Sequence, residues 1–246
     1  MAEVIANGGK RLDLTSVMAE LEALGTEQTR KTYRNHGARE PLFGVTLRDM
    51  KPLAKTIKKD HALAMELYAT GNYDAQTLAG IVAEPDKMTA SDFERWMETA
   101  NCRATTDYVV AVTLAETDFA EELADRWIDS GDENDQSAGW NSYCRLLSIR
   151  PDEQFDRGKL GKMLQRVVRD IHGQSNWVKY AMNNFVISVG VSYLPLHKEA
   201  MEAALKIGAV SVDHGNTSCK TPLAADYIRK AEEKQRLGFK RRNARC

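Results

Sequence analysis

A polar stretch near the C-terminus, residues 212–220, concentrates side chains that can do chemistry. It holds Asp213, His214, Cys219 and Lys220. An acid, an imidazole, a thiol and an amine this close together suit a catalytic or anion-binding site, and the small residues between them expose backbone amides to phosphate. A structured loop that closes the fold is the competing interpretation. Elsewhere the sequence has no metal-ligand spacing, P-loop or dinucleotide fingerprint, so we expect neither a metal nor a cofactor.

Basic and aromatic side chains offer a second kind of chemistry, contact with nucleic acid. Arg48, Lys51 and Lys55 are three and four residues apart, which places them on one face of a helix where they could meet phosphates. A solvated face is an equally good interpretation. Trp140 and Trp177 are either core residues of their helices or contacts to a sugar–phosphate backbone or an exposed base.

The charge is distributed unevenly along the chain. Residues 155–246 carry 17 basic and 8 acidic side chains, net +9, whereas residues 85–154 are net −10. A basic C-terminal third can attract a polyanion. Residues 234–246 hold six basic residues and no acidic one, and we expect a flexible basic tail whose Lys240, Arg241 and Arg242 meet phosphates. A solvated face with a tail that only aids solubility is the alternative.

Composition is that of a folded, water-soluble domain. The chain has 246 residues, of which 43% are hydrophobic and 28% charged. No apolar run approaches the roughly 20 residues that span a bilayer, and residues 1–11 lack the apolar segment of a secretion signal. We therefore expect a cytoplasmic protein. Its four cysteines, which form no C-x-x-C pair, are then reduced structural thiols, and they are Cys102, Cys144, Cys219 and Cys246.

Apolar residues recur with a period near 3.6 along most of the chain, and strand-like alternation is scarce, so the sequence predicts an all-α fold. Asp13, Thr26 and Thr46 are placed to begin helices, and Gly25, Gly37, Gly71 and Pro85 to end them. Further helices are predicted over residues 89–99, 104–116, 118–130, 138–149, 158–171, 176–191 and 196–207.

A weak internal repeat accompanies these helices. Arg103, Trp140 and Trp177 are spaced 37 residues apart, and each introduces a similar apolar helix that follows an amphipathic one. Helix pairs with a period near 40 are typical of HEAT-like solenoids, in which neighbouring pairs stack and curve around a binding surface. We expect one such domain over residues 1–233, followed by the basic tail. Chance spacing of bulky residues is the alternative.

Two consecutive stretches, residues 43–55 and 60–79, add a resemblance. In the first, Gly44 and Val45 lead into a helix with Leu47, Arg48 and Lys55; the second has a helix ending in an aromatic, a small residue and Gly71, followed by an acidic-Ala helix. This order resembles the DNA alkylation repair family of HEAT-like alkylpurine DNA glycosylases, over roughly residues 26–192. The resemblance implies DNA binding and excision of 3-methyladenine or 7-methylguanine by hydrolysis of the N-glycosidic bond.

The resemblance also implies a site. The family's carboxylate follows a tryptophan by four residues, and its place falls on Asp107, where it would stabilise a cationic sugar. The tryptophan's place falls on Arg103, an arginine expected on the next repeat falls near Ser142 or Tyr143, and a second tryptophan falls near Asn184. Only Asp107 keeps the expected residue type. An ion pair with Arg103, one helical turn earlier, is the competing role for this acid.

The sequence thus predicts a DNA-binding protein, either a glycosylase that uses Asp107 or a relative that recognises DNA shape without catalysis. The rival hypothesis is a HEAT-type scaffold that binds a protein through its acidic middle repeats. We expect a monomer. The residues expected to contact DNA are Arg48, Lys51, Arg103, Trp140, Tyr143, Trp177, Lys179, Asn184, Lys220, Lys240, Arg241 and Arg242.

Overall fold

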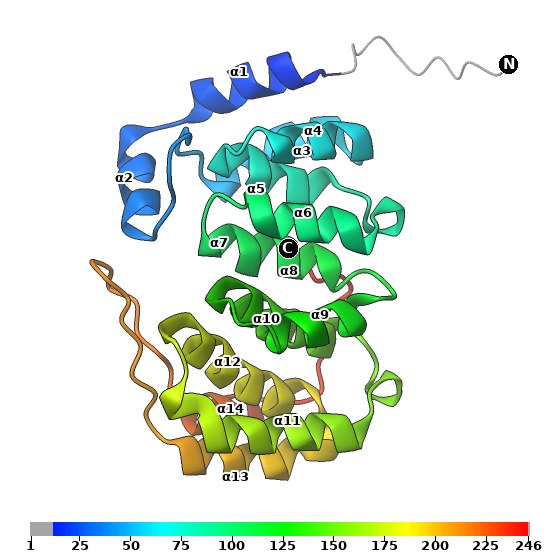
Figure 1. The fold of residues 1–246 in the computed structure, drawn as a ribbon, viewed down its shortest axis with the longest axis vertical. Coiled ribbons are helices and arrows are strands. Elements are labelled where there is room, and N and C mark those ends of the chain that lie inside the picture. Colours follow the sequence, from blue (N-terminus) through cyan, green and yellow to red (C-terminus); the bar gives the residue numbers. More distant parts are fainter. Residues whose placement is uncertain (1–11, 246) are drawn as a thin grey trace, which may run out of the picture.

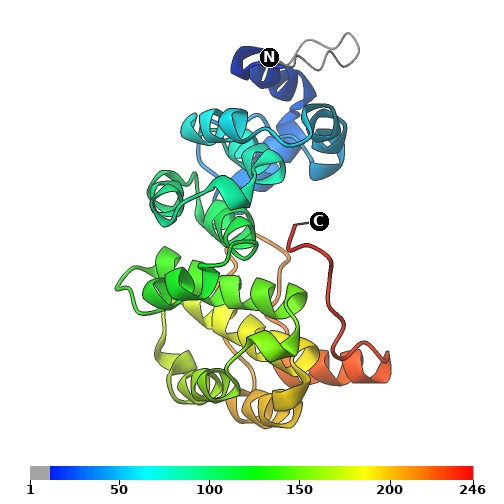
Figure 2. The ribbon, with the colours of Figure 1, turned by 90° about the vertical axis from the view of Figure 1, so that its right-hand side faces the viewer.

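The structure is a computed structural model that describes residues 12–245, so the predictions made on residues 1–11 and on Cys246 lie outside the described residues. Across residues 12–245 every regular element is a helix and none is a strand. The helices stack in antiparallel pairs into an elongated, layered body (Figures 1 and 2). The predicted all-α class is therefore confirmed. None of the described helices is both long and apolar enough to cross a bilayer.

The helices follow one another with short connections. Short 3₁₀ turns lie at Pro85–Lys87, Asp152–Gln154, Ile171–Gly173 and Leu194–Leu196, and a π-helical turn lies at Thr106–Val110. The α-helices are α1 Leu14–Leu24, α2 Glu27–Asn35, α3 Leu47–Ile57, α4 His61–Ala69, α5 Tyr73–Val82, α6 Ala90–Thr99, α7 Arg103–Thr105, α8 Ala111–Leu114, α9 Ala120–Ile128, α10 Glu133–Ile149, α11 Arg157–Asp170, α12 Asn176–Ser192, α13 His197–Ile207 and α14 Ala224–Glu233.

Side-chain caps begin several of these helices where the sequence predicts them. Asp13, Thr26 and Thr46 each accept a hydrogen bond from the backbone N–H three residues later. Such a cap satisfies one of the four N–H groups that the first turn of a helix leaves without a partner. The predicted starts of α1, α2 and α3 are thereby confirmed, and each has a local physical cause.

Helix α10 is the centre of the stack, because it packs against both α9 and α12. Gly139 allows the approach to α9, since a Cβ there would come within 2.7 Å of the Ala124 carbonyl oxygen. Trp140 is 1% exposed and packs its ring against Phe185 of α12, with 5.0 Å between ring centroids. Trp140 therefore belongs to the core, in the middle of α10. Its expected contact with DNA is corrected, because neighbouring helices cover the ring.

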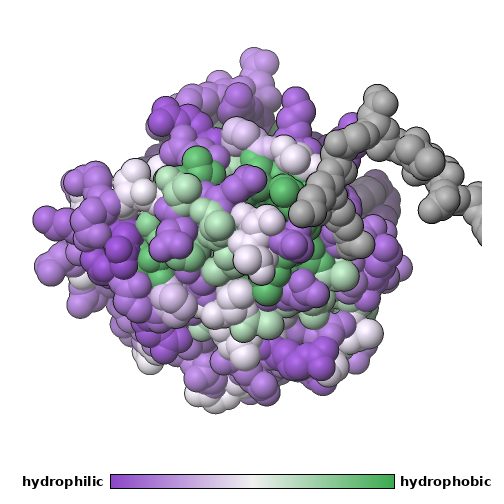
Figure 3. All heavy atoms as spheres, turned by 90° about the horizontal axis from the view of Figure 1, so that it is seen from above, coloured by the Kyte–Doolittle hydropathy of each residue, from purple (hydrophilic) through white to green (hydrophobic). Residues whose placement is uncertain are grey.

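The N-terminal end of the stack is closed by α1. This helix turns Val17 and Leu21 inward, where both are fully buried. Seen from that end, apolar side chains gather in the middle of the surface and polar ones surround them (Figure 3). The cap is thus built by amphipathic burial, as expected for a terminal element of a helical stack.

Two irregular segments complete the C-terminal part of the fold. Residues 208–223 form an irregular arm that leaves α13, passes the start of α12 and returns to α14 (Figure 1). Residues 236–245 then run from α14 back along the body (Figure 2); we call them the strap. Arg245 at its end donates to Glu116 and to the carbonyl oxygens of Gly80 and Ala83. The expectation of a flexible tail was wrong, because these contacts hold the segment against the body.

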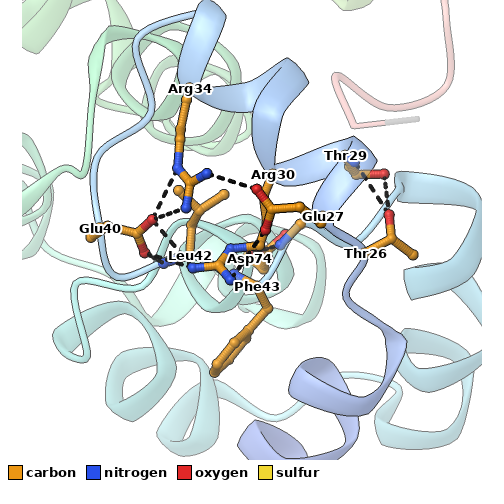
Figure 4. A network of polar contacts seen from close by, with 10 residues as sticks. Thr26, Glu27, Thr29, Arg30, Arg34, Glu40, Leu42, Phe43 and Asp74 are labelled. Atoms are coloured by element: carbon orange, nitrogen blue, oxygen red, sulfur yellow. Dashed lines mark hydrogen bonds and ion pairs between the residues drawn. The ribbon is translucent and has the colours of Figure 1, made fainter.

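The start of the solenoid depends on one buried carboxylate. Asp74, on α5, is fully buried and lies against Phe43 (Figure 4). It accepts three backbone N–H bonds, from Phe43 at 2.6 Å, Gly44 at 2.9 Å and Val45 at 2.8 Å. Gly44 has φ +82°, a conformation that favours glycine. The carboxylate therefore shapes the turn that leads into α3 and ties it to α5.

We expect Asp74→Ala to lower the free energy of unfolding by about 3 kcal/mol or more. The substitution leaves three backbone N–H groups without an acceptor, and a buried donor without a partner costs about 1–3 kcal/mol. Urea denaturation followed by circular dichroism measures the change. Asp226→Ala, at an exposed acid on α14, is the control and should change stability by about 0.5 kcal/mol or less. Equal losses in the two variants would contradict the role of Asp74.

Candidate nucleic-acid interface

A groove of about 940 Å³ lies on the face formed by α10 and α12, with the arm, α14 and the strap as further walls. Among the residues of 12–245 that line it, four are cationic, namely Arg145, Lys220, Arg236 and Arg241, and none is an aspartate or a glutamate. Four more are aromatic: Tyr108, Tyr180, Tyr227 and Phe239. A cationic, aromatic groove without acids has the composition of a surface that binds nucleic acid.

The positive charge of this groove is largely uncompensated. Within residues 12–245, neither Arg145 nor Lys220 nor Arg236 forms an ion pair with a carboxylate. The guanidinium of Arg145 instead lies 6.0 Å from the centroid of the Tyr108 ring, and its buried Nε has no hydrogen-bond partner. Unpaired cations on a concave surface focus a positive potential that attracts anions.

The strap fixes part of this wall. Gly238 donates its N–H to the Val191 carbonyl oxygen at 2.8 Å, and Arg241 donates its N–H to that of Ser148 at 2.7 Å. These bonds attach the strap to the ends of α12 and α10. The side chains of Phe239 and Arg241 are thereby carried on a fixed backbone at the edge of the groove.

Asp107 lies beside the groove but is closed off from it. It is 1% exposed and sits in the π-helical turn, where Ala111 N–H bonds the Thr106 carbonyl oxygen five residues earlier. Its Oδ2 accepts from Arg103 at 2.5 Å, and the Ser137 hydroxyl lies 3.0 and 3.1 Å from its two oxygens. Both carboxylate oxygens are therefore engaged within the protein. The ion pair that the sequence allowed as an alternative is present.

The Arg103 side chain covers this carboxylate. Its guanidinium carbon lies 3.7 Å from the centroid of the Trp177 ring, which is close cation–π stacking. Burial raises the pKa of Asp107, and the neighbouring Arg103 opposes that rise. Arg103 and Trp177 were each predicted to contact DNA, but in the structure the Arg103 guanidinium stacks on the Trp177 ring and pairs with the Asp107 carboxylate.

The reactive side chains of residues 212–220 do not gather into a catalytic site. The backbone N–H of Asp213 donates to Asn176 at 2.7 Å, and Asn176 donates back to the Asp213 carbonyl oxygen at 2.8 Å. His214 packs on Trp177 and shares a hydrogen bond with Thr221 at 3.0 Å. The structured-loop interpretation therefore fits this stretch, and Lys220 is the member of it that lines the groove. The described chain also has no group of three His, Cys, Asp or Glu side chains that could hold a metal ion.

The other predicted contacts divide by location. Asn184, Lys220 and Arg241 line the groove, whereas Arg48, Lys51, Lys179 and Arg242 do not. Tyr143 is fully buried, and its hydroxyl donates to Asp125 at 2.7 Å. Its expected contact with DNA is corrected, because its ring is part of the core.

Lys240 is corrected for a different reason, because its ammonium group is already bound inside the protein. The Nζ donates to the carbonyl oxygens of Leu147 and Ser192 at 2.9 and 2.6 Å, and it lies 2.8 Å from the carboxylate of Asp152. Two carbonyl oxygens thus accept from the ammonium group, and its charge is paired with the Asp152 carboxylate. Lys240 therefore holds the strap in place, and its charge is already paired within the protein.

Several groove residues were not among the sequence predictions. They come from α10, α12, α14, the strap and the turn next to Asp107, and they are Tyr108, Arg145, Tyr180, Tyr227, Arg236 and Phe239. Tyr108 and Arg145 had a local signal, since one follows Asp107 and the other lies two residues beyond Tyr143. Tyr227 and Phe239 had none, because α14 and the strap reach the groove only through the tertiary fold.

Known proteins share this architecture and much of this sequence. The family model described as "DNA alkylation repair enzyme" matches residues 17–230. This chain belongs to the DNA alkylation repair family. The uncharacterized proteins Lin0241 of Listeria innocua and Lmo0209 of Listeria monocytogenes are 33% and 32% identical over 220 residues, which cover 87% of this chain and 95% of each relative.

A solved structure extends the comparison to the fold. It is described as a new family of proteins related to the HEAT-like repeat DNA glycosylases with affinity for branched DNA structures. It matches with a TM-score of 0.89 and 49% identity, over 96% of this chain and 100% of that one. The predicted family and the predicted HEAT-like fold are both confirmed. This chain is thus similar in both fold and sequence to a protein for which affinity for branched DNA is stated.

We expect Arg103→Met to lower the free energy of unfolding at neutral pH by about 3 kcal/mol, because it leaves the Asp107 carboxylate buried and unpaired. The raised pKa of Asp107 sets the pH dependence. A folded state that holds a proton more tightly than the unfolded chain loses stability as pH rises between the two pKa values. Without Arg103 that pKa rises further, so the deficit of the variant should shrink as pH falls from 7. Urea denaturation across pH 4–7 measures it.

The double variant Arg103→Met/Asp107→Asn provides the control for this prediction. Removing the negative charge together with the positive one should recover at least half of the lost stability and flatten the pH dependence of the deficit. A deficit that is independent of pH, or one that the double variant does not reduce, would show that Arg103 acts by packing on Trp177 alone.

Proposed function

We propose that this protein binds branched DNA through the groove and does not excise bases. The observation that carries the proposal is the composition of the groove, with four cations, four aromatic rings and no acid. Phosphate contacts supply most of the affinity of such surfaces. The affinity for branched DNA that is stated for the similar solved structure supports the choice of ligand.

The surroundings of Asp107 argue against the glycosylase alternative. A carboxylate that stabilises a cationic sugar must face it across a short distance. Asp107 faces Arg103 and Ser137 instead, and it is 1% exposed. The Arg103 guanidinium that pairs with it is held in place by stacking on Trp177. A fixed cation 2.5 Å from the carboxylate also cancels much of the field that a developing positive charge would feel.

We expect the double variant Lys220→Ala/Arg236→Ala to bind a four-way junction about tenfold more weakly than the wild type at about 100 mM salt. Both side chains are exposed and form no ion pair with any acid of the described part of the chain, so their loss removes phosphate contacts without disturbing the core. Fluorescence anisotropy across a salt series measures affinity. The slope of log K against log salt should flatten by about 1–2, since each neutralised phosphate contributes about 0.9.

The matched control is Lys87→Ala/Arg95→Ala, which removes two exposed cations that pair with Glu84 and Asp92 away from the groove. This control should leave affinity within about twofold. Equal losses in the two double variants would show that net charge, rather than the groove, drives binding. Affinity that does not vary with salt would exclude a phosphate-driven contact.

We expect no free base from duplexes that contain 7-methylguanine or 3-methyladenine, because Asp107 cannot reach a bound sugar without displacing Arg103. Chromatography of the released bases after incubation with excess protein tests this expectation. Base release by the wild type that Asp107→Asn lowers about a hundredfold would contradict it and would assign catalysis to this acid.

A further inference from the structure

The exposed aromatic side chains of this protein occupy one place. Between residues 12 and 245, three aromatic side chains are classed as exposed: Tyr108 at 48%, Tyr227 at 55% and Phe239 at 69%. All three line the groove, although they come from the π-helical turn, α14 and the strap. An aromatic ring that stays exposed to water adds little to the stability of the fold. Because three distant segments bring such rings to one groove, their gathering indicates a shared ligand.

The backbone segments that carry Phe239 and Tyr227 are anchored to the body of the protein. Phe239 lies between Gly238 and Lys240, whose backbone N–H and ammonium group are both bonded to the ends of the inner helices. Tyr227 is carried by α14, and that helix is anchored where Ile228 packs against Gly190 of α12. These ring positions are therefore set by a fixed backbone, which reduces the entropy lost when a ligand stacks on them.

The charges around the rings identify the ligand as an anion that also carries flat, apolar faces. The Arg145 guanidinium lies over the Tyr108 ring. Arg236 also lines the groove, and in the sequence it falls between Tyr227 and Phe239. Rings alternating with unpaired cations are the arrangement that binds single-stranded nucleic acid, where bases stack and the backbone follows the charges. In a paired duplex the base faces are hidden, so these rings would have no base face to stack on.

The size of the groove agrees with such a segment. Its volume of about 940 Å³ falls within the range of roughly 300–1,000 Å³ that is typical of pockets for small molecules. A space of this size accommodates a few nucleotides and not a length of double helix. Its walls also offer the amides of Asn184 and Gln235 to base edges.

We propose that the groove captures unpaired nucleotides at the branch point of DNA, by stacking bases on Tyr108, Tyr227 and Phe239 while Arg145, Lys220 and Arg236 hold the phosphates. This inference rests on the proposed DNA-binding function and gives it a substrate class. The protein then recognises a branch by the few unpaired bases that the branch exposes. The paired DNA segments contribute contacts that do not depend on sequence.

The test compares two labelled three-way forks of the same sequence, one fully paired and one with a three-nucleotide single-stranded gap at the branch. Wild-type protein should bind the gapped fork about tenfold or more tightly by fluorescence anisotropy. Tyr227→Ala/Phe239→Ala should lose about tenfold or more on the gapped fork and about twofold or less on the paired one, as stacking contacts predict. Leu205→Ala, at a 62% exposed apolar residue on α13 outside the groove, is the control and should alter neither affinity.

A second readout follows stacking directly. With 2-aminopurine placed in the gap, its fluorescence should fall when wild-type protein binds and should change little with the Tyr227→Ala/Phe239→Ala variant at saturation. Equal wild-type affinity for the two forks, or equal losses by the variant on both, would overturn the stacking proposal while leaving groove-dependent DNA binding intact. Failure of the wild type to bind either fork at low salt would instead overturn the proposed function itself.

Discussion

The burial of α10 between α9 and α12 is the constraint on which the rest of the structure depends. A single helix pair exposes an apolar face that it cannot cover, so each pair is stable only when the next one stacks on it. Trp140 and Tyr143 are fully enclosed by this stacking. The opposite face of α10 and the facing side of α12 then remain open, and this is where the groove lies.

The state of Asp107 follows from the same packing. The π-helical turn before α8 places the acid against Ser137 of α10, and Trp177 at the start of α12 supplies the surface on which Arg103 rests. Three successive repeats thus contribute to one buried ion pair. A buried charge is tolerated only with such partners, so the position that would carry chemistry in a glycosylase acts here as a structural contact between repeats.

The strap connects parts of the solenoid that are far apart in the sequence. It leaves α14, crosses the ends of α12 and α10, and finishes at Glu116 and the end of α5, where Arg245 donates to the Gly80 and Ala83 carbonyl oxygens. Its cations have two roles that composition cannot separate. Lys240 and Arg245 bind the protein itself, whereas Arg236 and Arg241 line the groove. The binding surface and the brace are therefore one segment.

Local rules determined most of the fold. Helix caps such as Asp13 and Thr46, the 3.6-residue period and the resemblance of residues 43–79 led to an all-α, HEAT-like member of the DNA alkylation repair family. These signals lie within one or two helices, where short-range hydrogen bonds and amphipathic burial decide the outcome. The ion pair of Arg103 with Asp107 was open to the same reasoning, because residues four apart meet on a helix.

The binding surface was decided by the tertiary structure. The residue type alone does not tell whether Trp140 and Tyr143 are buried or exposed. Their rings are buried because α9 and α12 pack against α10. The cations of the last thirteen residues look alike in sequence, yet long-range contacts bind Lys240 inward and leave Arg236 and Phe239 on the groove. Such contacts join residues more than 90 positions apart, as between Lys240 and Leu147, and neither periodicity nor spacing carries information over that distance.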